Sequence, residues 1–278
     1  MTLFNKYYLL LLITSLNLNV TLAQSTKIIS YNIRYDNNTD KENNWNNRKD
    51  KIISLLKNNN PDILGIQEGL IQQVNYLDSC LSNYKYIGIG RDGKNKGEFS
   101  AIFYDSLKYN VIESNTFWLS NTPNKISKGW DAALNRICTY ALFENLKSHK
   151  KVWIFNTHFD HIGKIARKNS VQLILTKINE INTANLPLIL MGDLNLTPEE
   201  TPIQQLKLSL DDALEISNTP LSGPKGTFNG FSLEEVSKKI DYFFTKTLTI
   251  LSYTHINDLE IFNSHISDHL PIMIEVKF

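Results

Sequence analysis

The chain has 278 residues, of which 42% are hydrophobic and 21% are charged, an ordinary globular composition with room for one large domain or two small ones. Its formal net charge is +1 at pH 7, so it lacks the strong positive field expected of a dedicated duplex-DNA binder. A local basic loop could still hold a phosphate group.

Residues 1–23 have the pattern of a secretory signal peptide. Lys6 supplies the positive start, residues 7–16 form a short apolar core, and Thr21-Leu22-Ala23 is a small-residue cleavage site. Lys6 is the only charged residue there, so removal leaves 29 − 1 = 28 basic against 28 acidic residues. The alternative, an uncleaved anchor, is disfavoured because the core is short for a membrane span.

From this segment we expect a protein that is exported to the periplasm or the cell exterior. Residues 24–278 are expected to form a single domain, which we expect to be a monomer without stable membrane association. The two cysteines, Cys80 and Cys138, do not make a disulfide framework, and both are expected to be free and buried. The sequence contains no cysteine motif for a metal.

Hydrophobic periodicity predicts strand–helix units at both ends of the chain and a block of consecutive strands in the middle. Strands are predicted at 27–33, 62–66, 84–89, 99–104, 111–119, 137–143, 152–156, 187–191, 241–244, 248–253 and 271–277. Helices are predicted around 52–56, where Asn60-Pro61 ends the helix, and at 71–81, 164–181 and 202–208. The Asn-rich segment 36–47 is predicted to be a loop.

The predicted strands are apolar almost throughout, so both faces of each sheet should be covered. Two packed sheets with helices outside satisfy this requirement. Polar residues recur where these strands end, at Asn32, Glu68, His158, Asp160, Asp193, Asn195, Asp241, Asp268 and His269. Each alone has an ordinary explanation as a turn residue or a solvated group, but their recurrence indicates a site, because functional groups gather on loops held by a rigid sheet.

The residue types fit one chemistry. Carboxylate and amide oxygens suit Mg²⁺ or Mn²⁺, and the absence of cysteine ligands disfavours structural zinc. Such an ion polarises a phosphoryl oxygen, and imidazoles move protons near neutral pH or donate hydrogen bonds to phosphate. Asn195 and Arg136 could hold the phosphoryl group itself.

In these residues the chain resembles the endonuclease/exonuclease/phosphatase, or DNase I-like, superfamily, and within it an exported bacterial branch. The matching stretches occur in the family's order and are Tyr31-Asn32-Ile33, Gln67-Glu68, Gly97-Glu98-Phe99-Ser100-Ala101-Ile102-Phe103-Tyr104, Thr157-His158-Phe159-Asp160, Gly192-Asp193-Leu194-Asn195, Ile240-Asp241-Tyr242-Phe243-Phe244 and Ser267-Asp268-His269-Leu270-Pro271. The resemblance implies a four-layer α/β sandwich of two packed mixed sheets flanked by helices, with the site at one end of the sheets.

The resemblance also implies roles. Asn32 and Glu68 would bind the metal, with Asp268 nearby. Asp193 would position or deprotonate the attacking water, with Asn195 beside it. His269 would contact the phosphate and be oriented by Asp241 rather than by its neighbour Asp268, since adjacent residues on an extended segment point in opposite directions. His158 would be a second imidazole that contacts the phosphate, with Glu98 behind it, and Arg136 would be a phosphate clamp.

The other histidines, His149, His255 and His265, have no predicted role. His161, three positions after His158, is expected to lie outside the site. The basic residues Arg91, Lys94 and Lys96 fall in one loop near Glu98, enough to cradle a phosphate.

The predicted function is divalent-metal-dependent hydrolysis of a phosphodiester or a phosphomonoester by an activated water. Nucleic acids and nucleotides are among the candidate substrates, and a nuclease acting specifically on DNA or RNA stays open as an alternative. So does a catalytically silent secreted module that binds phosphate ligands. A glycosidase using Glu68 and Asp193 is a weaker alternative, because it leaves the histidines and Asn195 unexplained.

Overall fold

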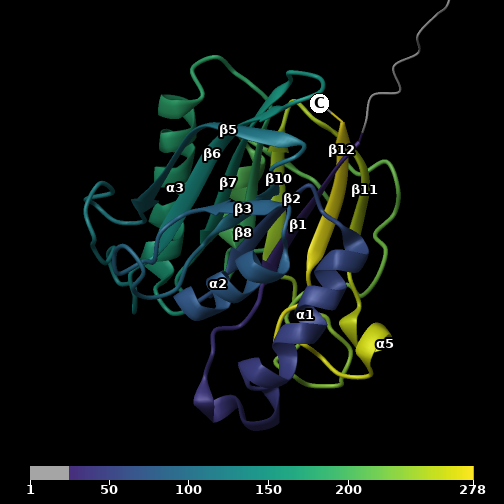
Figure 1. Cartoon of the computed structure of the whole chain (residues 1–278). Coiled ribbons are helices and arrows are strands. Elements are labelled where there is room, and N and C mark those ends of the chain that lie inside the picture. The colour runs from purple at the N-terminus through teal and green to yellow at the C-terminus, as the bar shows by residue number, and fades with distance from the viewer. Residues whose placement is uncertain (1–24, 278) are drawn as a thin grey trace, which may run out of the picture.

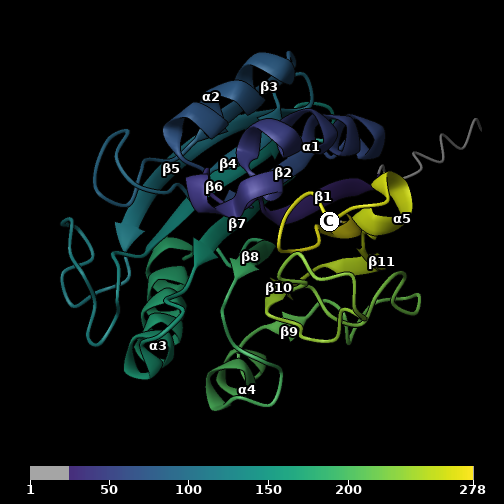
Figure 2. The ribbon, with the colours of Figure 1, turned by 90° about the horizontal axis from the view of Figure 1, so that it is seen from below.

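The computed structural model describes residues 25–277 and shows two six-stranded sheets packed face to face, with helices on their outer faces (Figure 1). Seen from below, α1 and α2 cover one sheet while α3 and α4 lie beside the other (Figure 2). This is the four-layer α/β sandwich that the sequence predicted. The predicted signal segment lies outside the described residues.

Each sheet mixes parallel and antiparallel neighbours. The first sheet has the order β11 (Thr249–His255), β12 (Ile272–Lys277), β1 (Thr26–Asn32), β2 (Ile63–Gln67), β4 (Ile102–Asp105) and β3 (Tyr84–Ile87). The second has the order β5 (Tyr109–Trp118), β6 (Ile137–Asn145), β7 (Lys151–His158), β8 (Leu188–Asp193), β10 (Asp241–Lys246) and β9 (Asp211–Asp212). In both sheets a parallel strand pair, β1 with β2 and β7 with β8, lies at the centre.

Three hydrophobic cores separate the four layers. One lies between the sheets, one joins the first sheet to α1 (Trp45–Asn59) and α2 (Ile71–Cys80), and one joins the second sheet to α3 (Lys164–Ile181) and α4 (Thr201–Lys207). The short helices η1 (Asn38–Asn43) and α5 (Asp258–Phe262) complete the described chain. Within residues 25–277 no helix combines the length and apolarity needed to cross a bilayer.

Strand β1 shows why the strands are apolar on both faces. Ile28 packs between the two sheets, whereas Ile29 and Tyr31 pack on the side of α1 and α2. Burying one such aliphatic side chain contributes roughly 1.5–3 kcal/mol. Because both faces of the central strands are buried in this way, the alternation of a one-sided strand is absent from the sequence.

Strand register brings the predicted site residues to one end of the sandwich. Asn32 ends β1 opposite Gln67, the residue before Glu68. In the other sheet, Asp193 ends β8 opposite both His158 of β7 and Asp241 of β10. The polar groups therefore lie at the ends of the two central strand pairs, where the sequence predicted them.

Four elements differ from the predictions: η1, the start of α1, β9 and α5. The segment 36–47 was expected to be a loop, yet it contains η1 and the start of α1. Buried Trp45 and Arg48 anchor the start of this helix, an effect of tertiary packing that local propensity does not register. The short elements β9 and α5 were not predicted, because two and five residues carry too little periodicity.

Candidate functional site

The imidazole of His269 lies at the centre of the site and is 3% exposed. Its Nδ1 lies 2.9 Å from Oδ2 of Asp241, twenty-eight residues earlier in the chain, and its Nε2 lies 3.6 Å from Oδ2 of Asp193. Since a carboxylate only accepts, Nδ1 donates to Asp241. The predicted orientation of His269 by Asp241 is thereby confirmed.

Asn32 joins the two sheets at this point. Its side-chain Nδ2 donates to Oδ2 of Asp193 at 3.0 Å and to Oε1 of Glu68 at 3.1 Å, and it lies 3.5 Å from Nε2 of His269. The backbone N–H of Arg34 donates to the Asn32 Oδ1 at 3.0 Å, which fixes the orientation of the amide. One amide group thus holds carboxylates from both sheets in contact.

His158 and Asn195 form the other side of this centre. Asn195 donates from Nδ2 to Nε2 of His158 at 3.1 Å and to the carbonyl of Phe159 at 3.1 Å. Its backbone N–H donates to Oδ1 of Asp193 at 2.9 Å, and its φ of 50° places it in the left-handed region. Nε2 of His158 lies 3.4 Å from Oδ2 of Asp193, so these three residues meet as predicted.

The backbone at position 192, the first residue of the Gly-Asp-Leu-Asn stretch, requires glycine. Its φ is +139°, and a Cβ added there would lie 1.9 Å from the backbone oxygen of Thr157 on β7. Any side chain would push β7 and β8 apart next to His158 and Asp193, the residues that end these strands. The glycine is therefore required by close strand packing as well as by backbone conformation.

Burial and charge together set the protonation of the centre. Burial alone would lower the pKa of His269, but the carboxylates of Asp241 and Asp193 raise it to about 10. Burial raises the pKa of Asp193, with His269 opposing the shift and Asp241 adding to it. The pKa of His158 is lowered, first by burial and then by the positive charge of Arg136. At neutral pH the centre thus pairs one imidazolium with one neutral imidazole.

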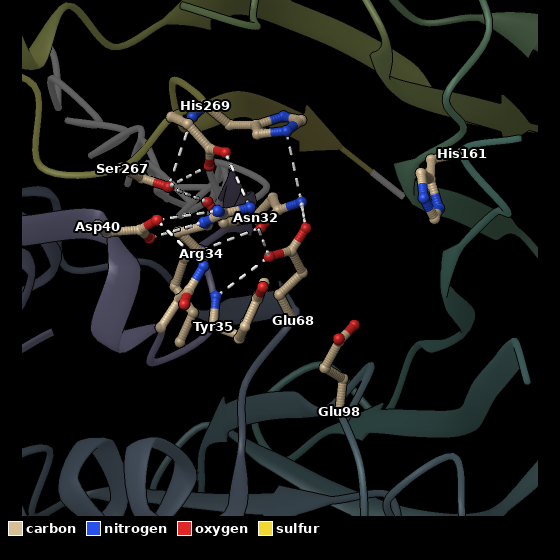
Figure 3. Close-up of polar contacts among 12 residues, drawn as sticks. Asn32, Arg34, Tyr35, Asp40, Glu68, Glu98, His161, Ser267 and His269 are labelled. Carbon is tan, nitrogen blue, oxygen red and sulfur yellow. Dashed lines mark hydrogen bonds and ion pairs between the residues drawn. The ribbon is translucent and has the colours of Figure 1, made fainter. Parts of the chain in front are cut away.

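Arg34 links three carboxylates beside this centre (Figure 3). It donates from Nε and Nη2 to Asp40 at 2.9 and 3.1 Å, and its Nη1 lies 3.5 Å from Oδ2 of Asp268 and 4.0 Å from Oε2 of Glu68. Glu68 also accepts the backbone N–H of Tyr35 at 3.1 Å. Arg34 therefore brings Asp268 and Glu68 together, and the metal role predicted for both stays a prediction.

The charge balance favours a bound cation. The carboxylates at the centre belong to Glu68, Asp193, Asp241 and Asp268, while the cations that face them are His269 and Arg34, and Arg34 is shared with Asp40. Burial of so many anions without compensation is costly. The oxygens of Glu68, Asp268 and Asn32 are the hard ligands that Mg²⁺ and Mn²⁺ prefer, so the residues fit such an ion.

A second grouping of ligand atoms has the spacing of a metal site. One ligand atom each from Asp193, Asp241 and His269 lie within 4.8 Å of one another. Nevertheless, Nδ1 of His269 and Oδ2 of Asp241 are bonded to each other, and an imidazolium has no free lone pair for an ion. We therefore favour the Glu68 and Asp268 side for the metal.

Two predicted site residues, Glu98 and Arg136, are paired with protein groups. Glu98 was expected behind His158, but it accepts from Arg91 at 2.6 Å, and the buried Nδ1 of His158 has no hydrogen-bond partner. Burial, followed by the charge of Glu68, raises the pKa of Glu98 to about 7. The matching stretch begins at Gly97 and does not contain Arg91, so it did not predict this ion pair.

Arg136, predicted to clamp phosphate, is 5% exposed and pairs with protein groups. Its Nη1 lies 3.8 Å from Glu98, its Nε lies 3.6 Å from Asp160, and its Nη2 donates to Nδ1 of His161 at 3.2 Å. Asp160 in turn accepts four backbone N–H groups, from residues 133, 134, 162 and 163. Arg136 is thus held between loops, and Asp160 organises those loops rather than meeting the centre.

Sequence reasoning missed Arg34, Arg48 and His161. Arg48 is 2% exposed and donates to the backbone carbonyls of residues 33, 34, 43 and 266, which ties the loop after β1 to the loop before β12. No local signal marks Arg48, because its partners are carbonyls distant in sequence. The position of Arg34, two residues after Asn32, was the one available clue. The cysteines are free, with Cys138 buried and Cys80 only half-buried, which corrects one expectation.

Comparison with known proteins identifies the family to which this site belongs. The model of the Endonuclease/Exonuclease/phosphatase family matches residues 29–269. The chain belongs to this family. Its members are phosphoesterases that act on phosphate esters, and they generally use a divalent metal.

Individual relatives cover nearly the whole described chain. The chain is similar to the mannosyl-6-phosphatase Bt3783 of Bacteroides thetaiotaomicron, with 35% identity, a TM-score of 0.87, and coverage of 91% of this chain and 100% of that one. A family structure from Bacteroides vulgatus gives 35% identity, a TM-score of 0.87, and coverage of 92% and 99%. An uncharacterised protein of Acanthamoeba polyphaga mimivirus is 30% identical, with 83% of this chain and 91% of that protein covered.

Proposed function

We propose that this member of the family is a divalent-metal-dependent phosphoesterase that hydrolyses its substrate with an activated water. The observation that carries the proposal is the position of His269, held by Asp241 at Nδ1 and turned by Nε2 toward Asp193 and Asn32. An oriented imidazolium beside a buried carboxylate, next to hard oxygen ligands, supplies the groups that phosphoryl transfer to water requires.

Each residue of the centre has a separate task in this reaction. His269, charged at neutral pH, donates from Nε2 to a phosphoryl oxygen and stabilises the charge that develops there. Asp193, whose pKa is raised by burial, accepts the proton of the attacking water. Asn195 keeps Asp193 in place through its backbone N–H and donates from its side chain toward His158.

The metal would be held by Glu68, Asp268 and Asn32. When bound, Mg²⁺ or Mn²⁺ supplies positive charge that offsets the negative charge of the reacting phosphoryl group. Arg34 contributes a fixed charge beside the same carboxylates. His158, neutral because burial lowers its pKa, accepts from Asn195 at Nε2 and lies 3.4 Å from Asp193, so it lines the reacting centre without adding charge.

The favoured substrates are small phosphomonoesters. The likeness to a mannosyl-6-phosphatase along the full length of that chain supports a monoester. The formal net charge of +1 supports a small molecule over a long polyanion, whose binding depends on many cationic contacts. A nuclease acting on DNA or RNA is the competing assignment, and the substrate panel below separates the two.

The test is hydrolysis of p-nitrophenyl phosphate, sugar phosphates, bis-p-nitrophenyl phosphate and single-stranded DNA and RNA, each with Mg²⁺, with Mn²⁺ and with EDTA. We expect metal-dependent turnover of monoesters, stopped by EDTA and reduced by at least about 10³-fold in His269→Ala and Asp193→Ala. The exposed His149 provides the matched control, and His149→Ala should retain full activity. Turnover that persists in EDTA and in both variants would overturn the proposal.

A catalytically silent binding module predicts a different outcome. Such a protein would bind phosphate esters without turning over any of them under any metal. The complete set of Asn32, Glu68, Asp193, Asp268 and His269, all within one hydrogen-bonded and ion-paired cluster, supports an active enzyme instead.

We also propose that the protein is exported and works as a monomer in the periplasm or outside the cell. The support is the signal-like pattern of residues 1–23. N-terminal sequencing of the protein recovered from an outer cellular fraction should begin at Gln24, and size-exclusion chromatography should give the mass of one chain. A full-length protein retained in the membrane pellet would contradict the export proposal.

A further inference from the structure

Three loops beside the catalytic centre are tied together by side chains that the proposed reaction does not use. Arg91 donates to Glu98 at 2.6 Å, Arg136 lies 3.8 Å from Glu98, and Arg136 donates to His161 at 3.2 Å. We call Arg91, Glu98, Arg136 and His161 the lateral wall of the site. Asn135 also donates to Asp92 at 2.8 Å, which fixes two of these loops to each other.

The lateral wall borders the centre directly. Arg91, Glu98, Arg136 and His158 line one small hollow, and the Nε2 of His158 lies 3.4 Å from Asp193. Figure 3 shows Glu98 and His161 on the opposite side of the site from Arg34 and Asp40. A phosphate ester bound at the centre therefore directs its alcohol portion along either of two sides, and the wall forms one of them.

Arg136 determines what His161 offers to a ligand. A guanidinium is always a donor, so the Nδ1 of His161 accepts from it and carries no proton. The proton of the ring then sits on Nε2, on the side away from Arg136. Since His161 is exposed while Arg136 is 5% exposed, the histidine presents a fixed N–H donor to the solvent, and the arginine acts by holding it.

Both guanidiniums of the wall are already paired with carboxylates. The guanidinium of Arg91 is paired with Glu98, and that of Arg136 is paired with Asp160 and Glu98. The wall nevertheless offers donors, from Arg91 and His161, close to an acceptor, the carboxylate of Glu98. A hydroxyl group both donates and accepts, so donors beside an acceptor, with both guanidiniums already paired, suit a polyhydroxylated ligand better than a polyanion.

We propose that the lateral wall binds the hydroxyl groups of the substrate's alcohol portion, with His161 as a direct contact and Arg136 as its positioning residue. The substrates are then phosphate monoesters of polyhydroxylated alcohols, of which sugar phosphates are the common class. This inference rests on the proposed phosphoesterase function.

The test compares two monoesters that share a phosphate and differ in their hydroxyl groups, namely p-nitrophenyl phosphate and mannose 6-phosphate. In His161→Ala, kcat/KM for mannose 6-phosphate should fall by about tenfold, the effect of one lost hydrogen bond, while kcat/KM for p-nitrophenyl phosphate stays within about twofold. His161→Gln retains an N–H donor and should restore part of the loss. Arg136→Lys should show the same selectivity, since it disturbs the ring that it holds.

The outcomes separate the inference from the proposed function. Failure of the wild-type protein to hydrolyse p-nitrophenyl phosphate with either metal refutes the phosphoesterase function itself. Metal-dependent hydrolysis of p-nitrophenyl phosphate with an equal fall for both monoesters in His161→Ala, or with no fall for either, refutes the wall as a hydroxyl subsite. Wild-type preference for single-stranded nucleic acid over both monoesters also refutes it.

Discussion

Replacing Asp241 by asparagine isolates the electrostatic part of the site. The change keeps the shape of the side chain but removes the negative charge that lies 2.9 Å from Nδ1 of His269. It also allows the amide to turn an N–H toward the imidazole, where the carboxylate can only accept. Both effects disfavour the imidazolium form that we assign to the reaction.

The magnitude follows from the pKa of His269. It is raised from the ordinary value of 6.5 to about 10 although burial opposes the shift, and the raising groups are Asp241 first and Asp193 second. At about 1.4 kcal/mol per pKa unit, the net shift corresponds to about 5 kcal/mol in favour of the charged ring. If Asp241 supplies roughly half of this, about 2–3 kcal/mol, the pKa of His269 falls by about two units in Asp241→Asn, so that at pH 9 most of the rings are neutral and kcat falls by about tenfold.

Two measurements check this number. The first is kcat for p-nitrophenyl phosphate with Mg²⁺, measured between pH 6 and pH 10. The range ends at pH 10 because the pKa of the wild-type His269 ring is about 10. The second is an NMR titration of the His269 ring. Because Asp241→Asn lowers the pKa of His269, the ring should lose its proton at lower pH, and the alkaline limb of the rate profile should move the same way.

Asp211 supplies the control, since it is an exposed aspartate in the same sheet and lies on β9 opposite Thr245, four residues along β10 from Asp241. Asp211→Asn should leave both kcat and the His269 titration unchanged. The reasoning is refuted if Asp241→Asn keeps kcat within about threefold of the wild type while the His269 pKa stays near its original value.

Three further predictions concern the framework of the site. Arg48→Met leaves buried carbonyls without a donor and should lower the free energy of unfolding by about 3–5 kcal/mol in urea titrations. Lys57→Met, at an exposed position of the same helix, should change it by less than about 1 kcal/mol. Gly192→Ala should cost about 3 kcal/mol or more and reduce activity, because its Cβ meets the backbone of β7; a stable, active variant would show that the strands can separate. Burial lowers the pKa of His255 from 6.5 to about 4, so the unfolded state binds the proton more tightly and stability should fall by up to about 3 kcal/mol as pH drops from about 6.5 to about 4. His255→Asn should lose that part of the pH dependence, and an unchanged profile would contradict the assignment.

The sequence by itself determined the fold class and the location of the site. Strands without alternation require cover on both faces, and that demand leads to two sheets between helices. Polar residues at successive strand ends, such as Asn32, Glu68 and Asp193, gather at one edge because register fixes where each strand stops. The ordered motifs also identified the family, and the helix at Lys164–Ile181 matched its predicted bounds.

Pairing within the site was only partly determined. Asp241 was matched to His269 because neighbours on an extended segment point apart, and the structure confirms that inference. Glu98 could not be matched in the same way. Its partner, Arg91, comes from the same loop, and the direction of a loop side chain depends on packing that no local pattern encodes.

Tertiary structure alone decided the contacts between distant segments. The side chain of Asn32 meets Asp193, 161 residues later and in the other sheet, and Arg48 meets the carbonyl of Ile266, 218 residues later. Such contacts depend on how two sheets are stacked and offset, which the periodicity within each strand does not specify. The role of His161 has the same origin, because only the position of Arg136 beside it fixes which ring nitrogen faces a ligand.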